Sequence, residues 1–313
     1  MEQIEKYIII LYYKYTKIKN LQYFKNKHFK FCQNLKLLGR IIISNEGING
    51  TLSGKVENIN QYIKIMQENE IFNDIDFKIT KYKKNVFKKL SIKIKKEIVN
   101  LKLDKDIDML KIKNNYLNPQ EFHENLKNID NIILDVRNDY EYQLGHFKNA
   151  INPKIKNFRD LPTWVEKNKN LLKNKKIITY CTGGIRCEKF SAFLKSKGFS
   201  NTFQLKGGVI SYGNANFTKE ILWNGKLYVF DSRIAIKINN QKYKIVGKDT
   251  FDNKPCERYI NCANPICNKQ FFCSENNEHK FFGSCCYECQ INKNNRYIIK
   301  NKIIKNKNIK NNL

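Results

Sequence analysis

The chain has 313 residues, of which 41% are hydrophobic, and this length allows two or three small domains, each with its own core. No apolar run is long enough to span a membrane and the first residues lack a signal-peptide pattern, which argues against a membrane protein and favours a soluble cytoplasmic one. The formal net charge of +29 favours a nucleic-acid partner, although the abundance of Asn, Ile and Lys also fits an A- and T-rich genome.

Residues 1–100 are predicted to form a ferredoxin-like α+β domain, because strand-like and helix-like segments follow one another in the split βαβ order. The expected elements are a strand at residues 7–13, a helix at 21–38, two strands within 39–54, a helix at 56–66 and a strand at 77–82. Four polar residues lie in the glycine-rich turn between the paired strands: Asn45, Glu46, Asn49 and Thr51. Turn chemistry explains them, and a role in substrate binding is the alternative.

Residues 78–102 hold ten Lys and one acidic residue, interrupted by Tyr82, Phe87 and Leu90. Such a stretch is either a solvated face or a surface that binds RNA phosphates and stacks on bases. The candidate RNA contacts in it are Lys83, Lys84, Lys88 and Lys89.

Residues 101–118 are predicted to be a polar connector that ends at the turn signal Asn118-Pro119, and a second domain is expected at residues 119–222. Its short apolar strands alternate with helices and lie near residues 131–136, 175–181 and 203–208. This alternation predicts a parallel sheet with helices on both faces.

The second of these strands runs into YCTGGIRCEKFSAFL (residues 180–194), so Cys181 lies at the carboxyl end of a parallel strand, where α/β sheets bind ligands. A helix is predicted at residues 187–197, with Gly198 as its left-handed cap. Loop N–H groups at the helix N-terminus and the charge of Arg186 favour a thiolate, so Cys181 and Arg186 are the candidate catalytic residues. The candidate anion cradle consists of Thr182, Gly183, Gly184 and Ile185.

Both cysteines of this segment have an alternative interpretation. Cys181 is otherwise a small buried apolar residue, as free cysteines often are. Cys187 is either a second reactive thiol or a residue that packs inward from the first helical turn. Four residues separate Cys181 from Arg186, one fewer than in cysteine phosphatases on similar scaffolds, and this shorter loop suits one extra sulfur atom or a bare thiolate.

Three polar residues of the second domain are assigned structural roles in preference to functional ones. Asp135 and Arg137 are expected to form ion pairs, with Glu141 or with a neighbour, and His146 is expected to be a turn histidine.

Residues 223–290 are predicted to be a cysteine-rich C-terminal region, because seven of the ten cysteines lie between Cys256 and Cys289. Without a signal peptide, this cluster favours a metal site over disulfides. The spacing Cys286-x-x-Cys289 is typical of a zinc knuckle, and buried reduced thiols are the alternative. The candidate zinc ligands are Cys262, Cys267, Cys286 and Cys289. Residues 291–313 carry seven basic residues and are expected to be a disordered tail.

Several motifs resemble known families. Residues 134–153, 180–199 and 203–212 resemble the successive motifs of a rhodanese domain, whose loop cysteine carries a persulfide. The flanking segments resemble the bacterial tRNA uridine(34) hydroxylase family: GRIIISNEGINGTLSG (39–54), KKEIV (95–99), WNGKLYVFDSR (223–233) and INCANPICN (260–268). The similarity runs from about Tyr7 to Cys289, and it implies an acylphosphatase-like domain, a rhodanese domain and a cysteine-containing C-terminal region.

The resemblance implies oxygen-dependent hydroxylation of the wobble uridine of tRNA to 5-hydroxyuridine, with Cys181 as the active cysteine. One hypothesis has the Cys181 thiolate add to C6 of uracil while Arg186 and the loop N–H groups stabilise the resulting oxygen charge. Another has a persulfide on Cys181 supply reducing equivalents. The alternative functions are a rhodanese-type sulfurtransferase and an inactive tRNA-binding module. The resemblance implies molecular oxygen as the co-substrate and leaves the electron donor unassigned. No haem motif or Gly-x-Gly-x-x-Gly motif occurs, so a bound haem or flavin is not supported, and non-haem iron stays open.

Overall fold

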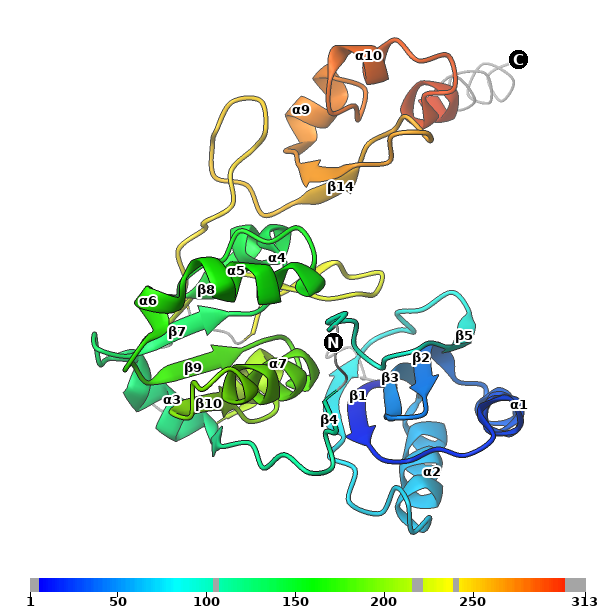
Figure 1. The fold of residues 1–313 in the computed structure, drawn as a ribbon. Helices are drawn as coiled ribbons and strands as arrows, with labels where there is room; N and C mark the ends of the chain where they lie inside the picture. The colour runs from blue at the N-terminus through cyan, green and yellow to red at the C-terminus, as the bar shows by residue number, and fades with distance from the viewer. Residues whose placement is uncertain (1–5, 104–106, 216–221, 239–241, 302–313) are drawn as a thin grey trace.

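The computed structural model describes residues 6–103, 107–215, 222–238 and 242–301. An N-terminal domain, blue to cyan in Figure 1, lies beside a larger α/β domain drawn in green. Residues 259–301, drawn in orange and red, lie on the side of α4 (Asp139–Leu144) in the α/β domain and away from the N-terminal sheet. Within the described ranges, no helix is both long enough and apolar enough to cross a bilayer.

The N-terminal domain is a five-stranded sheet in the order β4-β1-β3-β2-β5. Its elements are β1 (Tyr7–Tyr15), α1 (Leu21–Asn34), β2 (Leu38–Ser44), β3 (Gly47–Lys55), α2 (Val56–Gln67), β4 (Lys78–Tyr82) and β5 (Leu90–Ile94). The first four strands and both helices follow the predicted split βαβ order. The fifth strand, β5, pairs in parallel with β2 and was not predicted, although Leu90, Ile92 and Ile94 alternate with polar residues as in a strand.

Helix α1 is shorter than its apolar spacing predicts. It ends at Asn34, because Lys36 adopts a positive φ of 52° and the chain then turns into β2. Leu37 belongs to that turn and is buried in the core. Its apolar character at helical spacing therefore reflects burial, although the residue lies outside the helix.

The two faces of the N-terminal sheet have different partners. Ile10 and Tyr12 of β1 point into the core together with buried residues of α1 and α2. Because successive residues of a strand point to opposite faces, Leu11 and Tyr13 lie on the other face, which is turned toward the α/β domain.

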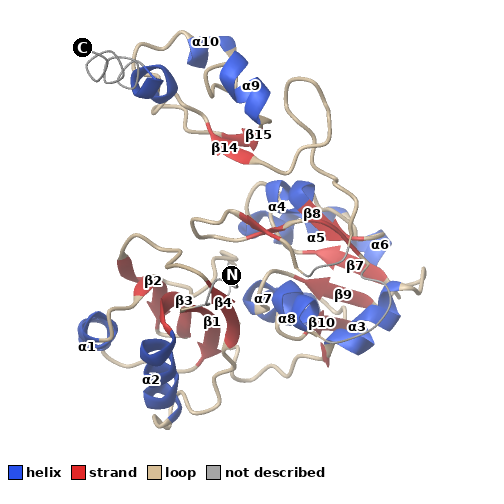
Figure 2. Cartoon of the chain, turned by 180° about the vertical axis from the view of Figure 1, so that it is seen from behind, coloured by secondary structure: helices blue, strands red, loops and turns tan. Residues whose placement is uncertain are grey.

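The α/β domain contains a parallel sheet in the order β6-β10-β9-β7. Its strands and helices are β6 (Tyr116–Leu117), α3 (Pro119–Leu126), β7 (Ile132–Asp135), α4 (Asp139–Leu144), β8 (Gly145–Phe147), η1 (Phe158–Asp160), α5 (Leu161–Lys167), α6 (Lys169–Leu172), β9 (Ile177–Tyr180), α7 (Ile185–Ser196), β10 (Thr202–Leu205) and α8 (Gly208–Asn214). One core lies between the sheet, α5 and α7, and a second between the sheet, α3 and α8. Figure 2 shows the strands between these helices, as the apolar alternation predicts.

The start of α3 and the end of α7 follow their sequence signals. Asn118 caps α3 in a capping box with Glu121, and Pro119 occupies the first helical position. Gly198, directly after α7, has a φ of 89°, which confirms the predicted left-handed cap.

The C-terminal segment is built from short strands and short helices. They are β11 (Trp223–Gly225), β12 (Leu227–Tyr228), β13 (Ala235–Ile236), β14 (Tyr259–Asn261), β15 (Gln270–Phe272), α9 (Glu275–Lys280) and α10 (Tyr287–Gln290). Strand β11 pairs with β8, and the Tyr259 hydroxyl donates a hydrogen bond to the Tyr140 carbonyl oxygen, so the segment packs on the α/β domain.

The predicted disordered tail is ordered at its beginning. Asn295 is fully buried, and its side-chain amide donates to Ser284 and to the carbonyl oxygens of Phe282 and Cys289. Residues 296–301 are helical. These hydrogen bonds attach residues 295–301 to the cysteine-rich region. The prediction of disorder rested on the charge of the tail, and charge alone does not indicate these hydrogen bonds. Residues 302–313 of the predicted tail lie outside the described residues.

Candidate active site

Cys181 follows β9 directly and lies at the N-terminus of α7, where the sequence places it. Its Sγ atom accepts a hydrogen bond from the backbone N–H of Gly184 at 3.1 Å, and the thiol is almost fully buried. The loop after Cys181 therefore curls around the sulfur atom and presents a backbone donor to it, as an anion site requires.

Opposing effects set the pKa of the Cys181 thiol. Burial raises this pKa, because it penalises the thiolate. A hydrogen bond from Cys187, the charge of Arg186 and backbone N–H groups outweigh burial and lower the pKa to about 6. Cys181 is thus mostly thiolate at neutral pH.

Arg186 is held in place by a buried carboxylate that sequence reasoning did not assign to the site. Its Nη1 and Nη2 atoms donate to the two oxygens of Glu141 at 2.6 and 2.8 Å, and Nη2 also donates to the Thr182 hydroxyl at 3.1 Å. This two-pronged ion pair fixes the guanidinium beside the thiol loop. The sequence signal was local only: Asn138 and Glu141 have capping-box spacing, and the partner of Glu141 lies 45 residues away.

Cys187 is fully buried in the core between the sheet and α7. Burial and the adjacent Cys181 sulfur raise its pKa well above the usual range, so Cys187 stays a neutral thiol. The geometry matches the inward-packing alternative for Cys187.

The three residues given structural roles make local contacts. Arg137 and Asp135 form a fully buried ion pair with an Nη2–Oδ2 distance of 2.6 Å, whereas Glu141 pairs with Arg186. His146 stacks on Tyr142 with ring centroids 3.8 Å apart, and its Nδ1 atom lies 2.8 Å from the Tyr142 carbonyl oxygen.

A cavity of about 840 Å³ lies between the thiol loop and the helix-free face of the N-terminal sheet. The loop contributes Cys181, Thr182, Gly183, Ile185 and Arg186, and the sheet contributes Leu11, Tyr13, Arg40, Ile42, Asn49 and Thr51. The two walls touch at Gly183, where an added Cβ would come within 2.1 Å of the Leu11 side chain. Gly183 therefore lets the N-terminal sheet approach the loop, in addition to letting the loop curl.

The cavity is lined by cations and aromatic rings. Five exposed basic residues that form no ion pair with any described residue are Arg40, Lys95, Lys96, Lys102 and Arg159. Phe87 and Phe230 add aromatic surface, and the Arg186 guanidinium lies 5.8 Å from the centre of the Phe230 ring. This combination suits a ligand that carries phosphates and a planar base.

None of the four lysines predicted to contact RNA is among the residues that line this cavity. Lys83, Lys84, Lys88 and Lys89 are exposed in the connection between β4 and β5, from which only Phe87 lines the cavity. The lining lysines Lys95, Lys96 and Lys102 belong to the same Lys-rich stretch but follow β5. Sequence reasoning missed them because it did not place β5 in the sheet.

One buried lysine joins the two domains beside the cavity. Lys189 of α7 is 2% exposed, and its Nζ atom lies 2.9 Å from Glu46 and 2.8 Å from Glu97, both in the N-terminal domain. The polar turn residue Glu46 thus holds the N-terminal domain against the thiol-loop helix.

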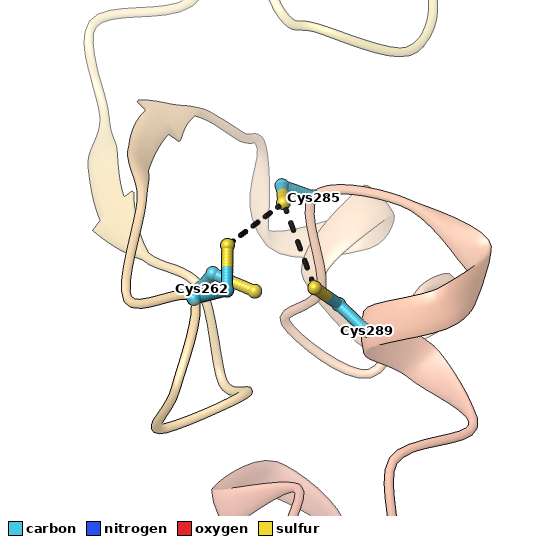
Figure 3. A group of neighbouring side chains, drawn as sticks. Cys262, Cys285 and Cys289 are labelled. Atoms are coloured by element: carbon cyan, nitrogen blue, oxygen red, sulfur yellow. Dashed lines mark hydrogen bonds between the residues drawn. The ribbon is translucent and has the colours of Figure 1, made fainter.

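The cysteine-rich region brings four thiols together. The Sγ atoms of Cys262, Cys267, Cys285 and Cys289 all lie within 4.8 Å of one another. Figure 3 shows the side chains of Cys262, Cys285 and Cys289 converging. The fourth member is Cys285 and not the predicted Cys286, which is exposed at the N-cap of α10. Cys285 precedes the N-cap of α10 and Cys289 lies within the helix, and their Sγ atoms are 4.0 Å apart.

Family models match three consecutive parts of the chain. They are a UPF0176 acylphosphatase like domain at residues 7–98, a rhodanese-like domain at residues 118–215 and a rhodanase C-terminal region at residues 224–290. These matches confirm the predicted fold class.

Curated relatives align over nearly the whole chain. The tRNA uridine(34) hydroxylase of Aster yellows witches'-broom phytoplasma is 56% identical over 94% of this chain and 96% of its own length. The tRNA uridine(34) hydroxylase of Acholeplasma laidlawii is 50% identical over 96% of this chain and 94% of its own. Among solved structures, a rhodanese-like domain protein from Staphylococcus aureus aligns with 25% identity over 34% of this chain and 99% of its own, with a TM-score of 0.27.

Proposed function

The chain belongs to the tRNA uridine(34) hydroxylase family, and from this premise we propose that it converts the wobble uridine of tRNA to 5-hydroxyuridine in the cavity beside Cys181. The observation that carries the proposal for this site is a thiol with a pKa of about 6 that lines a cavity built by two domains. A volume of about 840 Å³ is within the range of small-ligand sites and accepts one nucleotide turned out of its loop.

The lining of the cavity supports an RNA substrate. The five unpaired cations are suited to the phosphates on either side of the target nucleotide. Phe87 and Phe230 offer ring faces on which a base can stack. Lys83, Lys84, Lys88 and Lys89 are exposed in the connection that carries Phe87, and we assign them to phosphates of the tRNA outside the cavity.

The Cys181 thiolate supplies the nucleophile. It adds to C6 of uracil, and the electron pair of the C5–C6 double bond moves toward C5 and O4. C5 then bonds to molecular oxygen, and after proton uptake a 5-hydroperoxide results. Two electrons and two protons from a thiol reductant split the O–O bond, leaving a hydroxyl on C5 and releasing water. Loss of the C5 proton expels the Cys181 thiolate and restores the double bond.

The roles of neighbouring groups follow from their positions. The loop N–H of Gly184 and the charge of Arg186 keep Cys181 ionised, and Glu141 keeps Arg186 in place. The alternative mechanism also uses Cys181: a persulfide on this residue supplies the reducing electrons. Sulfur transfer to a small acceptor is not favoured, because that reaction does not require a cavity wall built from the N-terminal sheet.

We also propose that the cysteine tetrad holds a structural zinc ion. Zinc–sulfur distances of about 2.3 Å in a tetrahedron separate the sulfur atoms by about 3.8 Å. The Cys267–Cys285 and Cys285–Cys289 Sγ distances of 3.7 and 4.0 Å fit this arrangement. The Asn264 amide donates to Cys289 Sγ at 3.3 Å, and hydrogen bonds of this kind commonly orient the thiolate ligands of a metal.

As tRNA is the proposed substrate, the cytoplasm is the proposed compartment.

The test is nucleoside mass spectrometry of tRNA from cells that lack this protein and from the same cells complemented with wild type or with Cys181→Ser. We expect 5-hydroxyuridine and its derivatives to be lost in the deletion and restored by wild type only. If these nucleosides persist in deletion cells that have no other route to them, the proposed function is wrong. Full restoration by Cys181→Ser would remove Cys181 from the mechanism.

A further inference from the structure

Asn49 is a polar residue of the cavity wall with a fixed amide orientation. Its Nδ2 atom donates a hydrogen bond to the Ile98 carbonyl oxygen at 3.0 Å. Turning the amide over would place Oδ1 against that carbonyl oxygen, and two acceptors cannot hydrogen-bond. The Oδ1 atom accepts no hydrogen bond from the described residues, and one N–H of Nδ2 is spare. Asn49 thus presents one acceptor and one donor side by side.

The group that locks the amide is itself held by the domain interface. The Ile98 N–H donates to Glu46 Oε1 at 2.7 Å, and Glu46 forms the ion pair with Lys189 of α7. A chain of contacts therefore runs from the helix after Cys181, through Glu46 and Ile98, to Asn49. A glycine-rich turn alone does not require such a chain.

We propose that Asn49 reads the Watson–Crick edge of the target base and selects uracil over cytosine, a proposal that rests on the proposed function. The Oδ1 atom accepts the N3–H of uracil, and the spare Nδ2–H donates to O4. Cytosine presents an acceptor at N3 and a donor at N4, the reverse pattern. The amide cannot turn over without losing its hydrogen bond to Ile98. Against cytosine it therefore places the acceptor Oδ1 opposite the acceptor N3 and the Nδ2–H opposite the N4 donor.

This orientation also points C6, the atom that the thiolate attacks, away from the sheet wall. In the pyrimidine ring C6 lies directly opposite N3. When N3 and O4 face Asn49 on the sheet wall, the N1–C6 edge faces away from that wall and C5 lies at the side of the ring. The other wall of the same cavity is the thiol loop with Cys181, the group that adds to C6.

The test is equilibrium binding of the full chain to two fluorescent anticodon stem-loop RNAs that differ only by U or C at position 34. A bidentate amide–base pair gives about tenfold or more discrimination, so wild type is expected to bind the U34 RNA that much more tightly. Asn49→Ala is expected to bring the two affinities within about twofold, mainly by weakening the U34 complex. The matched control is Asn45→Ala, in the turn before the strand that holds Asn49. Asn45 is exposed and outside the cavity lining, so this variant is expected to keep the wild-type ratio.

Two further measurements separate recognition from folding and from chemistry. The melting temperature and the rate of Cys181 alkylation report an intact site, and an Asn49→Ala variant normal in both that keeps the U34 preference overturns the proposal. Equal binding of both RNAs by wild type also overturns it, even if wild type hydroxylates tRNA. If wild type prefers U34 and Asn49→Ala loses the preference while no 5-hydroxyuridine forms, the inference stands and the proposed function fails.

Discussion

At the scale of single residues, the chemistry of the site depends on how charge is arranged around one sulfur atom. Burial alone would keep Cys181 protonated, and the Gly184 N–H, the Cys187 thiol and the Arg186 charge reverse that effect. Glu141 holds the Arg186 guanidinium in place, and the ion pair offsets the free-energy cost of burying both charges. The site is therefore a network in which each buried charge has a partner.

Replacing Arg186 is expected to raise the pKa of the Cys181 thiol. In wild type, the rate of alkylation by iodoacetamide should rise with pH, with a midpoint near 6, and level off above about 7, because only the thiolate reacts. Arg186→Met removes the cation that favours the thiolate and leaves Glu141 unpaired, so both changes move the midpoint upward. The measurement is the alkylation rate of Cys181 from pH 4.5 to 9, followed by peptide mass spectrometry.

Arg258→Met serves as the control for that experiment, since Arg258 is also ion-paired, with Glu278, but does not line the cavity. It should leave the midpoint near 6. An unchanged midpoint in Arg186→Met would show that the Cys187 thiol and the backbone N–H groups keep the thiol ionised without Arg186.

At the scale of elements, the thiol loop is shaped by α8 as well as by α7. The N–H groups of Val209 and Ile210, at the start of α8, donate to the carbonyl oxygens of Cys181 and Thr182 at 2.9 and 3.1 Å. Gly208 makes this approach possible, because its φ is 68° and an added Cβ would lie 2.5 Å from the Cys181 carbonyl oxygen. Two helix N-termini therefore meet at one loop.

Gly208→Ala and Gly198→Ala should separate backbone strain from crowding. Both residues have positive φ, but nothing lies within 4 Å of a Cβ at Gly198. Gly198→Ala should cost about 1 kcal/mol in the free energy of unfolding and leave alkylation of Cys181 unchanged. Gly208→Ala should cost more and also slow alkylation, because the loop carbonyl groups must move. Urea denaturation and alkylation rates measure both effects, and equal values for the two variants would contradict this account.

The cysteine tetrad makes a second prediction at this scale. Cys285→Ser should lower the zinc content of the purified protein and its melting temperature, because the site loses a thiolate ligand. Cys286→Ser, one residue further and exposed, should retain both. Elemental analysis by mass spectrometry together with thermal melting tests the pair, and the reverse pattern would restore the ligand set predicted from the Cys286-x-x-Cys289 spacing.

At the scale of the whole molecule, the active site exists only where two domains meet. The thiol loop supplies Cys181, the proposed nucleophile, and the N-terminal sheet supplies the opposite wall, with Leu11 packed on Gly183. Lys189, Glu46 and Glu97 hold the domains together with buried charge.

Lys189→Met should loosen this interface. Removing the cation leaves two carboxylates facing one another with no cation between them, and breaking a buried ion pair costs about 3–5 kcal/mol. Lys197→Met removes an exposed pair with Glu166 just after the same helix and should change the stability much less, because solvent screens exposed charges. Chemical denaturation and limited proteolysis between the domains distinguish them. Equal stability of the two variants would mean that apolar contacts alone hold the domains together.

The sequence by itself determined the features that depend on near neighbours. Helical spacing with a glycine after it located α7 and its cap, Asn118-Pro119 located the start of α3, and the run from Cys181 to Arg186 located the thiol loop. These signals lie within a few residues because hydrogen bonds and side-chain contacts in helices and turns join residues two to four positions apart.

The tertiary structure decided everything that joins distant residues. Glu141 and Arg186 are 45 positions apart, and Glu46 and Lys189 are 143 positions apart. No pattern in the sequence indicates either ion pair. Register along β2 brought the unpredicted strand β5 into the sheet and its following lysines to the cavity. The choice between Cys285 and Cys286 depended on the backbone before α10, which leaves Cys286 exposed at the N-cap and places Cys285 Sγ within 4.8 Å of the Cys262 and Cys267 sulfur atoms. Packing sets these pairings, since burial of apolar surface and pairing of buried charge act through space and not along the chain.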